Sequence, residues 1–344
     1  MKVLIIGGAG FIGANAAHFY ARRGDDVTIL DNFSRPGSRV NAAWLAETYR
    51  TIKIVHGDIR SDHAALQAQM KSTDLILHEA GQVAVTTSVL DPRTDFEINA
   101  LGTLNVLEAL RHSGSDAALF FASTNKVYGG LEHLDVIERN GRYEFAGDAG
   151  VNESETLDFH SPYGCSKGCA EQYVRDYARI YGLKTVVFRQ SCIYGPHQFG
   201  VEDQGWVAWF SIRASQSQPI TVYGDGKQVR DVLYVDDLVA AYDAAYEHID
   251  VTSGQIYNLG GGPQNAMSLL ELIALLEKRY RRPLKVAFSS WRPGDQRVFI
   301  AGIDKANRDF GWKPTTSIPD GVDTMCAWID ENPELFAELA LVGT

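Results

Sequence analysis

Short apolar runs alternate with longer amphipathic stretches through the first half of the chain. Between the first two runs, residues 12–23 have helical spacing and end at Gly24, where glycine accepts a left-handed turn. Apolar runs of this kind, separated by helices, are typical of a parallel sheet covered by helices. The predicted strands are 2–6, 27–31, 52–56, 74–78, 117–122 and 185–189.

A long helix is predicted over residues 95–112. Leu101, Leu104 and Leu107 lie on one side of this helix, and Ile98 and Val106 lie on others. Apolar residues all round a helix indicate that two of its faces are buried, and the second face would then pack against another subunit.

After residue 190 the pattern is less regular. The polar, acidic segment 130–158 is expected to be an inserted loop or hairpin. Ser268 and Glu271 form a capping-box pattern, in which the serine caps a helix and the glutamate reaches back to it. Further helices are predicted at 205–217, 236–248, 268–281 and 320–331.

These elements predict an α/β fold, with a Rossmann-type doubly wound parallel sheet and a smaller mixed α/β substrate-binding domain. The dinucleotide-binding domain is expected to span 1–189, with a returning segment near 230–260. Residues 190–344 are expected to form mainly the second domain. No internal repeat or low-complexity segment interrupts this order.

Composition and charge narrow the possible partners. The formal net charge of −11 over 344 residues argues against binding to a nucleic-acid backbone. The four cysteines have no zinc-site spacing, so we expect neither a metal nor a disulfide. No apolar run is long enough to span a membrane, and the first residues run too directly into a glycine turn for a signal peptide. A cytoplasmic location is therefore expected.

A glycine turn follows the first strand and opens the first helix. Gly7, Gly10 and Gly13 allow a tight turn, close approach of a pyrophosphate to the backbone, and access to the amides of the helix N-terminus. Asp31 ends the next strand about twenty residues on, as a dinucleotide-binding fingerprint requires. Such an acid would bind the adenosine ribose hydroxyls and repel a 2′-phosphate, which favours NAD over NADP. Arg35 nearby leaves NADP open, because it could pair with that phosphate.

Other residues near the strand ends complete the expected cofactor site. Asp58 could accept a hydrogen bond from the adenine amino group, although an aspartate in a strand-end turn is also common. Small residues after the fourth strand would let the cofactor cross the sheet edge. The expected cofactor-binding residues, besides the three glycines and Asp31, are Phe11, Ile12, Asn32, Asp58, Ile59, Ala80, Gln82, Asn99, Tyr163 and Lys167.

Tyr163 and Lys167 are four residues apart, so one helical turn places both side chains on the same side. A free tyrosine is a poor base at neutral pH, but a neighbouring cation favours the phenolate and makes it a proton acceptor. The same pattern also arises by chance on helix surfaces. Thr124 strengthens the catalytic interpretation, because it leaves the fifth strand at its carboxyl end, where doubly wound folds place their sites. Thr124, Tyr163 and Lys167 are therefore the predicted catalytic residues.

The order of these motifs resembles the extended short-chain dehydrogenase/reductase family, the NAD-dependent epimerases and dehydratases that modify nucleotide sugars. The resemblance covers essentially residues 1–330. Within the family, several long strings are most similar to the CDP-paratose 2-epimerases, also called CDP-tyvelose 2-epimerases. These strings are Gln82-Val-Ala-Val-Thr-Thr-Ser88, Ser123-Thr-Asn-Lys-Val-Tyr-Gly129, Leu157-Asp-Phe-His-Ser-Pro-Tyr-Gly-Cys-Ser-Lys-Gly168, Asp203-Gln-Gly-Trp206 and Gly226-Lys-Gln-Val-Arg-Asp231.

The resemblance also implies a substrate site and an assembly. Arg230 and Arg292 would bind the diphosphate of the nucleotide sugar, and their guanidinium groups suit phosphate oxygens. Thr86 and Thr87, placed in a loop beside the nicotinamide, would contact the sugar. Asn125 and Gln190 complete the expected substrate-binding set. A homodimer or homotetramer is expected, with the Tyr163–Tyr181 helix joining 95–112 in a helical bundle across a two-fold axis.

The expected reaction is epimerisation of a nucleotide-activated hexose. The carbon to be inverted bears no acidic hydrogen, so it is first oxidised to a ketone, with hydride transfer to NAD and proton transfer to Tyr163, and is then reduced on the other face. The narrower resemblance implies C2 of a CDP-sugar, of the CDP-paratose to CDP-tyvelose type or of the CDP-glucose to CDP-mannose type.

Three other functions are weighed against this one. A UDP-sugar 4-epimerase is the nearest alternative, because the same three catalytic residues serve either carbon. A 4,6-dehydratase needs an Asp-Glu pair directly after the threonine, and this chain has Asn125 and Lys126 there. A non-catalytic NAD-sensing protein would not need Tyr163 and Lys167, both of which are present. The base, the exact sugar and the need for a 6-deoxy group stay open.

Overall fold

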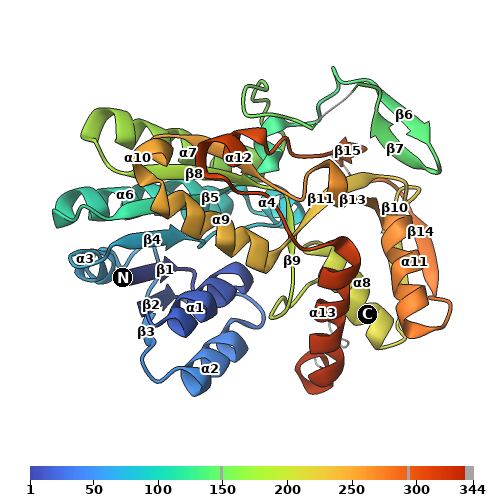
Figure 1. The fold of residues 1–344 in the computed structure, drawn as a ribbon, viewed down its shortest axis with the longest axis horizontal. Helices are drawn as coiled ribbons and strands as arrows, with labels where there is room; N and C mark the ends of the chain where they lie inside the picture. The colour runs from blue at the N-terminus through green and yellow to red at the C-terminus, as the bar shows by residue number, and fades with distance from the viewer. Residues whose placement is uncertain (148–149, 293–294, 338–344) are drawn as a thin grey trace.

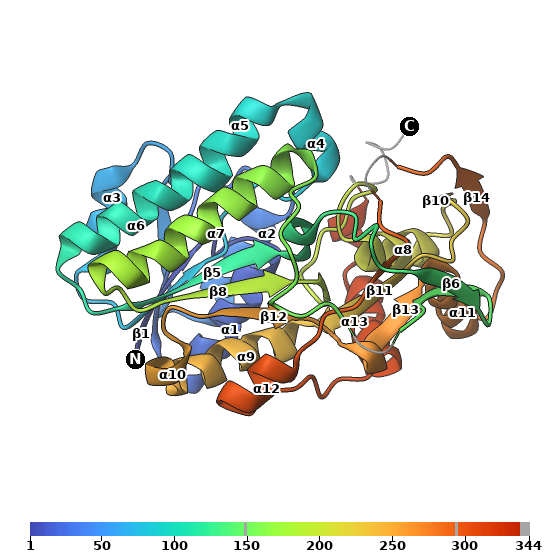
Figure 2. The ribbon, with the colours of Figure 1, turned by 90° about the horizontal axis from the view of Figure 1, so that it is seen from above.

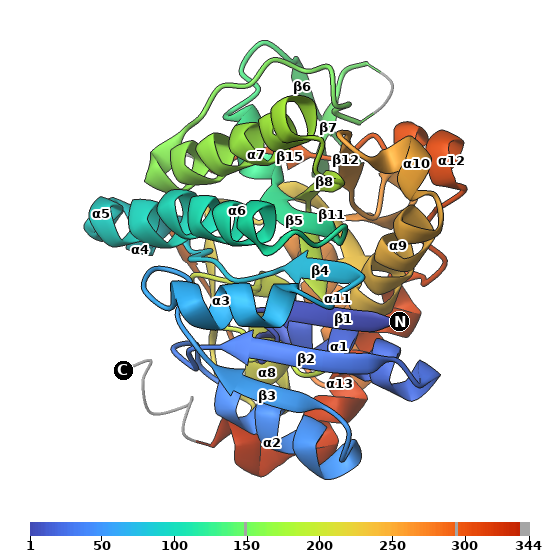
Figure 3. The same cartoon turned by 90° about the vertical axis from the view of Figure 1, so that its left-hand side faces the viewer.

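The computed structural model describes residues 1–147, 150–292 and 295–337. Seven parallel strands form its large sheet, in the order β12-β8-β5-β4-β1-β2-β3. Figure 1 shows this sheet with β8 to β3 labelled, and Figure 3 also labels β12. The chain crosses from β3 at one edge to β4 on the other side of β1. The switch point, where doubly wound sheets place their ligands, therefore lies between β1 and β4. The strands are β1 (Lys2–Ile6), β2 (Asp26–Asp31), β3 (Lys53–His56), β4 (Leu75–His78), β5 (Ala118–Thr124), β8 (Thr185–Gln190) and β12 (Ile256–Leu259).

Helices cover both faces of this sheet (Figure 3). Central strands such as β4 are buried along their whole length, because a parallel sheet covered on both faces exposes neither side to water. One face packs against α1 (Phe11–Arg23), α2 (Ser38–Thr48), α9 (Val235–Glu247) and α12 (Asp304–Phe310). The other packs against α3 (His63–Met70), α6 (Gly102–Ser113) and α7 (Ser161–Tyr181). The predicted α/β fold class is confirmed.

The helix predicted over 95–112 is not one regular α-helix. It consists of α5 (Pro92–Phe96), a π-helical turn η1 (Glu97–Leu101) and α6. The π turn contains Asn99, whose buried amide bonds Gln82, Asp95 and Ser166. π turns concentrate at functional sites, and hydrophobic spacing does not distinguish them from α-helix.

The rest of the chain forms smaller sheets and helices beside the carboxyl ends of the large sheet (Figure 2). Strand β11 pairs with β9, β13 and β15, and β10 pairs with β14. The strands are β9 (Cys192–Tyr194), β10 (Ile220–Tyr223), β11 (Val229–Tyr234), β13 (Ala266–Ser268), β14 (Val286–Ser289) and β15 (Val298–Phe299). The helices are α8 (Trp206–Ser215), α11 (Leu269–Tyr280) and α13 (Ile318–Glu331), with the short η3 (Pro263–Asn265) and η4 (Pro333–Phe336). The short α10 (Ile249–Thr252) lies instead at the other end of the large sheet, against α9 and α12.

Several local predictions are confirmed. Gly24 ends α1 in a left-handed conformation, with φ of 95°. Both hydrogen bonds of the Ser268–Glu271 capping box are present at the start of α11. The inserted segment 130–158 contains a hairpin of β6 (Val136–Arg139) and β7 (Arg142–Phe145).

The division of the chain into two domains stays a prediction. Within the segment near 230–260, α9 and β12 belong to the large sheet and its helices, whereas β11 belongs to the smaller sheet. No helix in the described part of the chain has the length and apolar character needed to cross a membrane.

Candidate active site

The glycine turn between β1 and α1 forms a tight cradle at the switch point. Gly7 has a φ of +84°, and a Cβ on it would lie 2.5 Å from the Ala80 amide nitrogen. A Cβ on Gly13 would lie 2.4 Å from the Gly7 carbonyl oxygen, so α1 packs directly on the turn. Gly10 is open on its Cβ side except for one backbone oxygen at 3.2 Å. The turn therefore leaves room at Gly10 and directs the free amides of α1 toward it, which fits a pyrophosphate.

Asp31 lies at the end of β2 beside this cradle and is buried. Its carboxylate accepts hydrogen bonds from the amides of Ala9 at 3.0 Å and Phe33 at 2.7 Å. These bonds fix the carboxylate against the glycine turn, where it would meet an adenosine ribose. Arg35 bonds the side chain of Gln204, so in this structure it is engaged by the segment that lines the neighbouring cavity.

The expected adenine end is held by a second carboxylate. Asp58 accepts hydrogen bonds from Asn32 Nδ2 at 2.9 Å and from the Arg60 guanidinium at 2.8 and 3.0 Å. The Arg60 contact holds the pKa of Asp58 well below its usual range. Ile59 is buried and packs against Gly102 of α6.

A buried network joins the turn after β4 to helix α7. The Asn99 side chain accepts from the Gln82 amide at 2.9 Å and donates to Ser166 Oγ at 3.0 Å. Ser166 in turn donates to Asp95. The network fixes α7 relative to the sheet edge, one residue before Lys167.

Tyr163 and Lys167 both lie within the first two turns of α7 and are almost fully buried. The amide of Tyr163 donates to Ser88 Oγ at 3.2 Å, which anchors the start of the helix. The Lys167 ammonium lies 4.2 Å from the centre of the Phe121 ring. A Cβ on Gly81 would lie 3.7 Å from Lys167 Nζ, so this cation faces the turn after β4.

Burial shifts both groups toward their neutral forms. It raises the pKa of Tyr163 to about 12, against the lowering effect of the Thr124 hydroxyl. It lowers the pKa of Lys167 to about 8, although Glu79, Glu171 and Asp95 act in the opposite direction. A tyrosine in this setting needs nearby positive charge to become a base, and Lys167 can supply part of that charge.

A cavity of about 380 Å³ opens beyond Tyr163, a size found in small-molecule sites. It brings together Thr124 and Tyr163 with most of the predicted substrate residues. Phe11, Ile12, Thr86, Asn125, Gln190, Arg230 and Arg292 all line it. Thr87 does not, because α4 (Val85–Leu90) is a helix rather than the expected loop and turns this residue outward. Only Thr86 is kept as a candidate for sugar contact.

The two arginines face the cavity from different elements. Arg230 on β11 is buried and binds Asp295 Oδ1 and the Gln296 carbonyl, each at 2.6 Å. Arg292 binds Asp203 at 2.8 Å and lies 3.9 Å above the Tyr223 ring. Both arginines were expected to bind the diphosphate of the substrate, and both lie in the wall of this cavity.

Four polar atoms at this cavity are buried and have no hydrogen-bond partner among the residues that the structure describes. They are Thr86 Oγ1, Gln198 Oε1, Trp206 Nε1 and Gln228 Oε1. Buried polar groups without partners are costly, so their position at a cavity indicates contacts reserved for a polar ligand. Gln198 and Gln228 were not predicted as site residues from the sequence. Gln228 directly precedes β11 and stands two residues before Arg230, and this i, i+2 spacing is the signal that could have found it.

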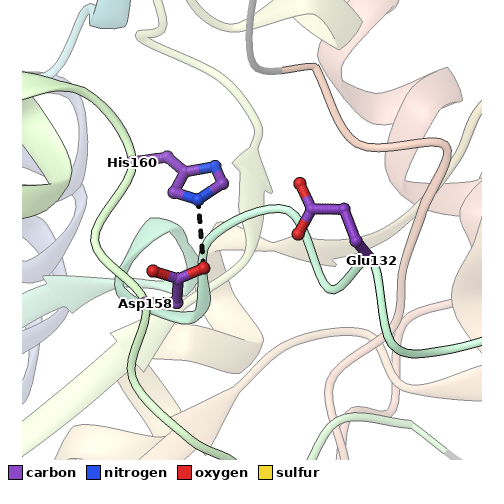
Figure 4. A group of neighbouring side chains, drawn as sticks. All are labelled: Glu132, Asp158 and His160. Carbon is purple, nitrogen blue, oxygen red and sulfur yellow. Dashed lines mark hydrogen bonds and ion pairs between the residues drawn. The ribbon is translucent and has the colours of Figure 1, made fainter.

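One group of possible metal ligands exists among the described residues (Figure 4). Glu132, Asp158 and His160 are all exposed, and His160 Nε2 lies 3.0 Å from Asp158. Exposed acidic groups commonly cluster in this way without an ion, and none of the three lines the cavity of Tyr163.

The fold and site define a class: an α/β protein with a glycine cradle that fits a dinucleotide and, beside it, a cavity lined by Thr124 and Tyr163. A sequence model described as the NAD dependent epimerase/dehydratase family matches residues 3–260. The chain belongs to this family and is an NAD-dependent enzyme. The family and cofactor expected from the motifs are thereby confirmed.

Similar proteins span the whole length of the chain. It is 46% identical to CDP-paratose 2-epimerase of Salmonella typhi, over 95% of this chain and 99% of that one. The UDP-glucuronic acid 4-epimerase of Bacillus cereus, solved with UDP-glucuronic acid and NAD, has a TM-score of 0.83 at 26% identity, covering 96% of this chain and 99% of that one. A dTDP-glucose 4,6-dehydratase from Streptomyces venezuelae, solved with NAD bound, has a TM-score of 0.84 at 27% identity, covering 98% and 100%.

Proposed function

We propose that this protein inverts C2 of a CDP-activated hexose. The observation that carries the proposal is the 46% identity to CDP-paratose 2-epimerase along almost the entire length of both chains. The site supports it, because Thr124 and Tyr163 open onto the same cavity as the two arginines suited to a diphosphate. The substrates proposed are of the CDP-paratose to CDP-tyvelose type or the CDP-glucose to CDP-mannose type.

In this proposal the cradle holds NAD. Gly7, Gly10 and Gly13 would admit the pyrophosphate, and Asp31 would bind the adenosine ribose. Asn32, Asp58 and Ile59 would surround the adenine, while Gln82, Asn99 and Lys167 would lie along the nicotinamide half. When bound, NAD would supply the acceptor and donor of a hydride for the sugar carbon.

The protein's own residues would handle the proton and hold the sugar. Tyr163 takes the proton of the C2 hydroxyl as C2 becomes a ketone, while Thr124 shares the hydrogen bond to the same oxygen. Lys167 favours the phenolate form of Tyr163 by its charge. After the ketone has turned its opposite face to the site, Tyr163 returns the proton.

A 4-epimerase is the alternative that a specific observation favours, because the UDP-glucuronic acid 4-epimerase shares the fold over nearly the whole chain. A 4,6-dehydratase is disfavoured by the positions after Thr124. Asn125 and Lys126 stand there, and neither provides the carboxyl groups that elimination needs. The three reactions give different products, so product analysis distinguishes them.

The test incubates purified protein with CDP-, UDP- and GDP-hexoses and assigns product stereochemistry by NMR. Inversion at C2 of the CDP-hexose, without added cofactor, is expected. Inversion at C4 of a UDP-hexose, with no change at C2 of any substrate, would contradict the proposal and support the 4-epimerase.

We also propose which parts of the chain bind the cofactor and which bind the substrate. Residues 1–189, with the segment near 230–260, would bind NAD, and 190–344 would bind mainly the nucleotide sugar. The cavity supports this division, because it is lined on one side by Tyr163 and on the other by Arg230 and Arg292. Catalysis would take place where the two parts meet. A cytoplasmic location, where nucleotide sugars are made, goes with this role.

We also propose a homodimer or homotetramer. Large apolar side chains are exposed along α4, α5, η1 and α7, and α6 and α7 lie side by side on the outside of the sheet (Figure 3). The exposed residues are Val89, Leu90, Phe96, Leu101, Tyr173, Ile180 and Tyr181. A bundle formed by these helices from two copies would bury this surface. A monomeric mass by light scattering at micromolar concentration would contradict it.

A further inference from the structure

Lys126 is a cavity residue that the proposed reaction does not use. It follows β5 in the 3-10 turn η2 (Asn125–Tyr128), two residues after Thr124. The Thr124 hydroxyl accepts the Lys126 amide at 3.2 Å, so the threonine that serves the reaction also fixes the backbone of the lysine. The side chain of Lys126 lines the same cavity as Thr124 and Tyr163.

The Lys126 ammonium is poorly satisfied by the protein. Its hydrogen bond is to the side-chain oxygen of Gln296, a neutral group, at 3.4 Å. The nearby Asp295 carboxylate is taken by Arg230 at 2.6 Å, and within the described ranges Lys126 makes no ion pair. Burial and the Arg230 charge lower the pKa of Lys126 to about 8. A cation held in a cavity with so little compensation suits an anionic ligand.

The position of Lys126 bears on which sugar carbon reacts. In a nucleotide hexose the diphosphate is attached to C1. C2 is bonded to C1, whereas C4 lies across the ring. When the C2 hydroxyl meets Thr124 and Tyr163, the phosphate on C1 must lie close beside them. When the C4 hydroxyl meets them, that phosphate is a ring's width away. A cation two residues from Thr124, on the side of Arg230, matches the first arrangement.

We propose that Lys126 binds the phosphate group carried on C1 and thereby places C2, rather than C4, at Thr124 and Tyr163. Lys126 is then a specificity-determining residue that extends the arginine site toward the reacting carbon. The inference rests on the proposed function, because it takes a nucleotide hexose as the ligand. It also gives a physical reason why a lysine replaces the carboxyl group that a dehydratase needs after its threonine: a carboxylate there would repel the phosphate.

The test compares nucleotides that differ only in the phosphate concerned. CDP carries the second phosphate and CMP lacks it, and both are titrated into the purified holoenzyme by calorimetry. Lys126→Met keeps the length of the side chain and removes its charge. A charge-assisted hydrogen bond is worth about 1.5–3 kcal/mol, so the dissociation constant for CDP should rise roughly 10- to 100-fold, with that for CMP changed by less than about 2-fold.

Three further variants make the result decisive. Lys126→Arg keeps the charge and should retain most of the CDP affinity, and Lys126→Gln provides a second neutral side chain if the methionine variant fails to fold. Lys285→Met removes an exposed lysine outside the cavity and should leave both affinities unchanged. Retention of bound NAD and an unchanged unfolding temperature show that each variant is intact.

Two binding results and one turnover result would overturn the inference. Equal losses for CMP and CDP would place Lys126 elsewhere on the nucleotide, and unchanged CDP affinity in the neutral variants would remove the phosphate contact altogether. If the wild-type protein binds UDP and not CDP, the proposed function is wrong about the nucleotide base of the substrate. The same comparison made with UMP and UDP then still tests the role of Lys126. Lys126→Gln should also lose C2 turnover more than Lys126→Arg, and equal turnover in the two would contradict the role in placing C2.

Discussion

The cradle expected to hold the dinucleotide and the cavity beyond Tyr163 differ in how their polar groups are satisfied. In the cradle, Asp31 and Asn99 are hydrogen-bonded within the protein. In the cavity, Trp206 Nε1, Gln228 Oε1 and two other buried polar atoms have no partner. In the cradle the side chains of Asp31 and Asn99 are therefore held by folding, and a ligand would meet the free backbone amides of α1. In the cavity a ligand would meet unpaired side-chain atoms. Changes in the first should act through the fold and cofactor retention, and changes in the second through the affinity for substrate.

The largest expected effect is at the junction of the two regions. Tyr163→Phe keeps the ring that packs in α7 and removes the proton acceptor. We expect turnover to fall by roughly 10²-fold or more, because general base catalysis contributes that much, while NAD stays bound. Steady-state rates and the nucleotide released on denaturation check both parts. Turnover close to that of the wild type would exclude Tyr163 as the base.

The cradle is tested by two alanines that differ in what they touch. Gly13→Ala places a Cβ 2.4 Å from the Gly7 carbonyl oxygen, so the free energy of unfolding should fall by about 1–3 kcal/mol and NAD should be lost. Gly10→Ala meets only one backbone atom at 3.2 Å, so it should weaken NAD binding with little loss of stability. Denaturant titration and cofactor content separate the two. Equal destabilisation by both would contradict the distinction.

A smaller effect is expected at Trp206 in the cavity. Trp206→Phe removes the unpartnered Nε1–H and keeps an aromatic ring. The value of KM should rise about 3- to 10-fold, as expected for loss of one hydrogen bond, whereas stability should hold or improve because a buried unpaired donor is gone. Kinetics and thermal unfolding measure both. A loss of stability with unchanged KM would show that the donor serves the fold.

The smallest expected effect separates two adjacent threonines. Thr86→Val removes a buried, unpartnered hydroxyl at the cavity, and KM should rise about 2- to 5-fold. Thr87→Val alters an exposed residue on the other side of α4 and should change KM by less than about 2-fold. Equal effects from the two variants would mean that α4 rearranges when substrate binds.

The same two regions differ in how far the sequence could predict them. The cradle depends on a contiguous glycine pattern and an acid at the next strand end, and both are local features that hydrophobic spacing places correctly. Six of the seven strands of the large sheet were predicted within about two residues for the same reason, whereas β12 was not predicted as a strand. Even here the π turn at 97–101 was missed, because its stability comes from the contacts of Asn99 with distant segments.

The cavity depends on segments that are far apart in the sequence. Thr124, Arg230 and Arg292 were found because motifs mark them, whereas Gln198 belongs to a loop that no pattern places beside them. Thr87 was misplaced because a helix of six residues is too short for its spacing to show. Whether a polar side chain is left unpaired depends on its tertiary neighbours. For that reason the features that define the substrate site required the structure.

The central claim is that the hydride leaves the sugar and returns to the same carbon through NAD, with Tyr163 handling only the proton. A CDP-hexose with deuterium at C2 is converted in ordinary water, and the unlabelled substrate is converted in deuterated water. NMR of the products reads the label and the stereochemistry together. The account predicts that the inverted product keeps its deuterium at C2 and gains none from solvent. Solvent deuterium at the inverted carbon would contradict it, because that result requires removal of a proton rather than transfer of a hydride.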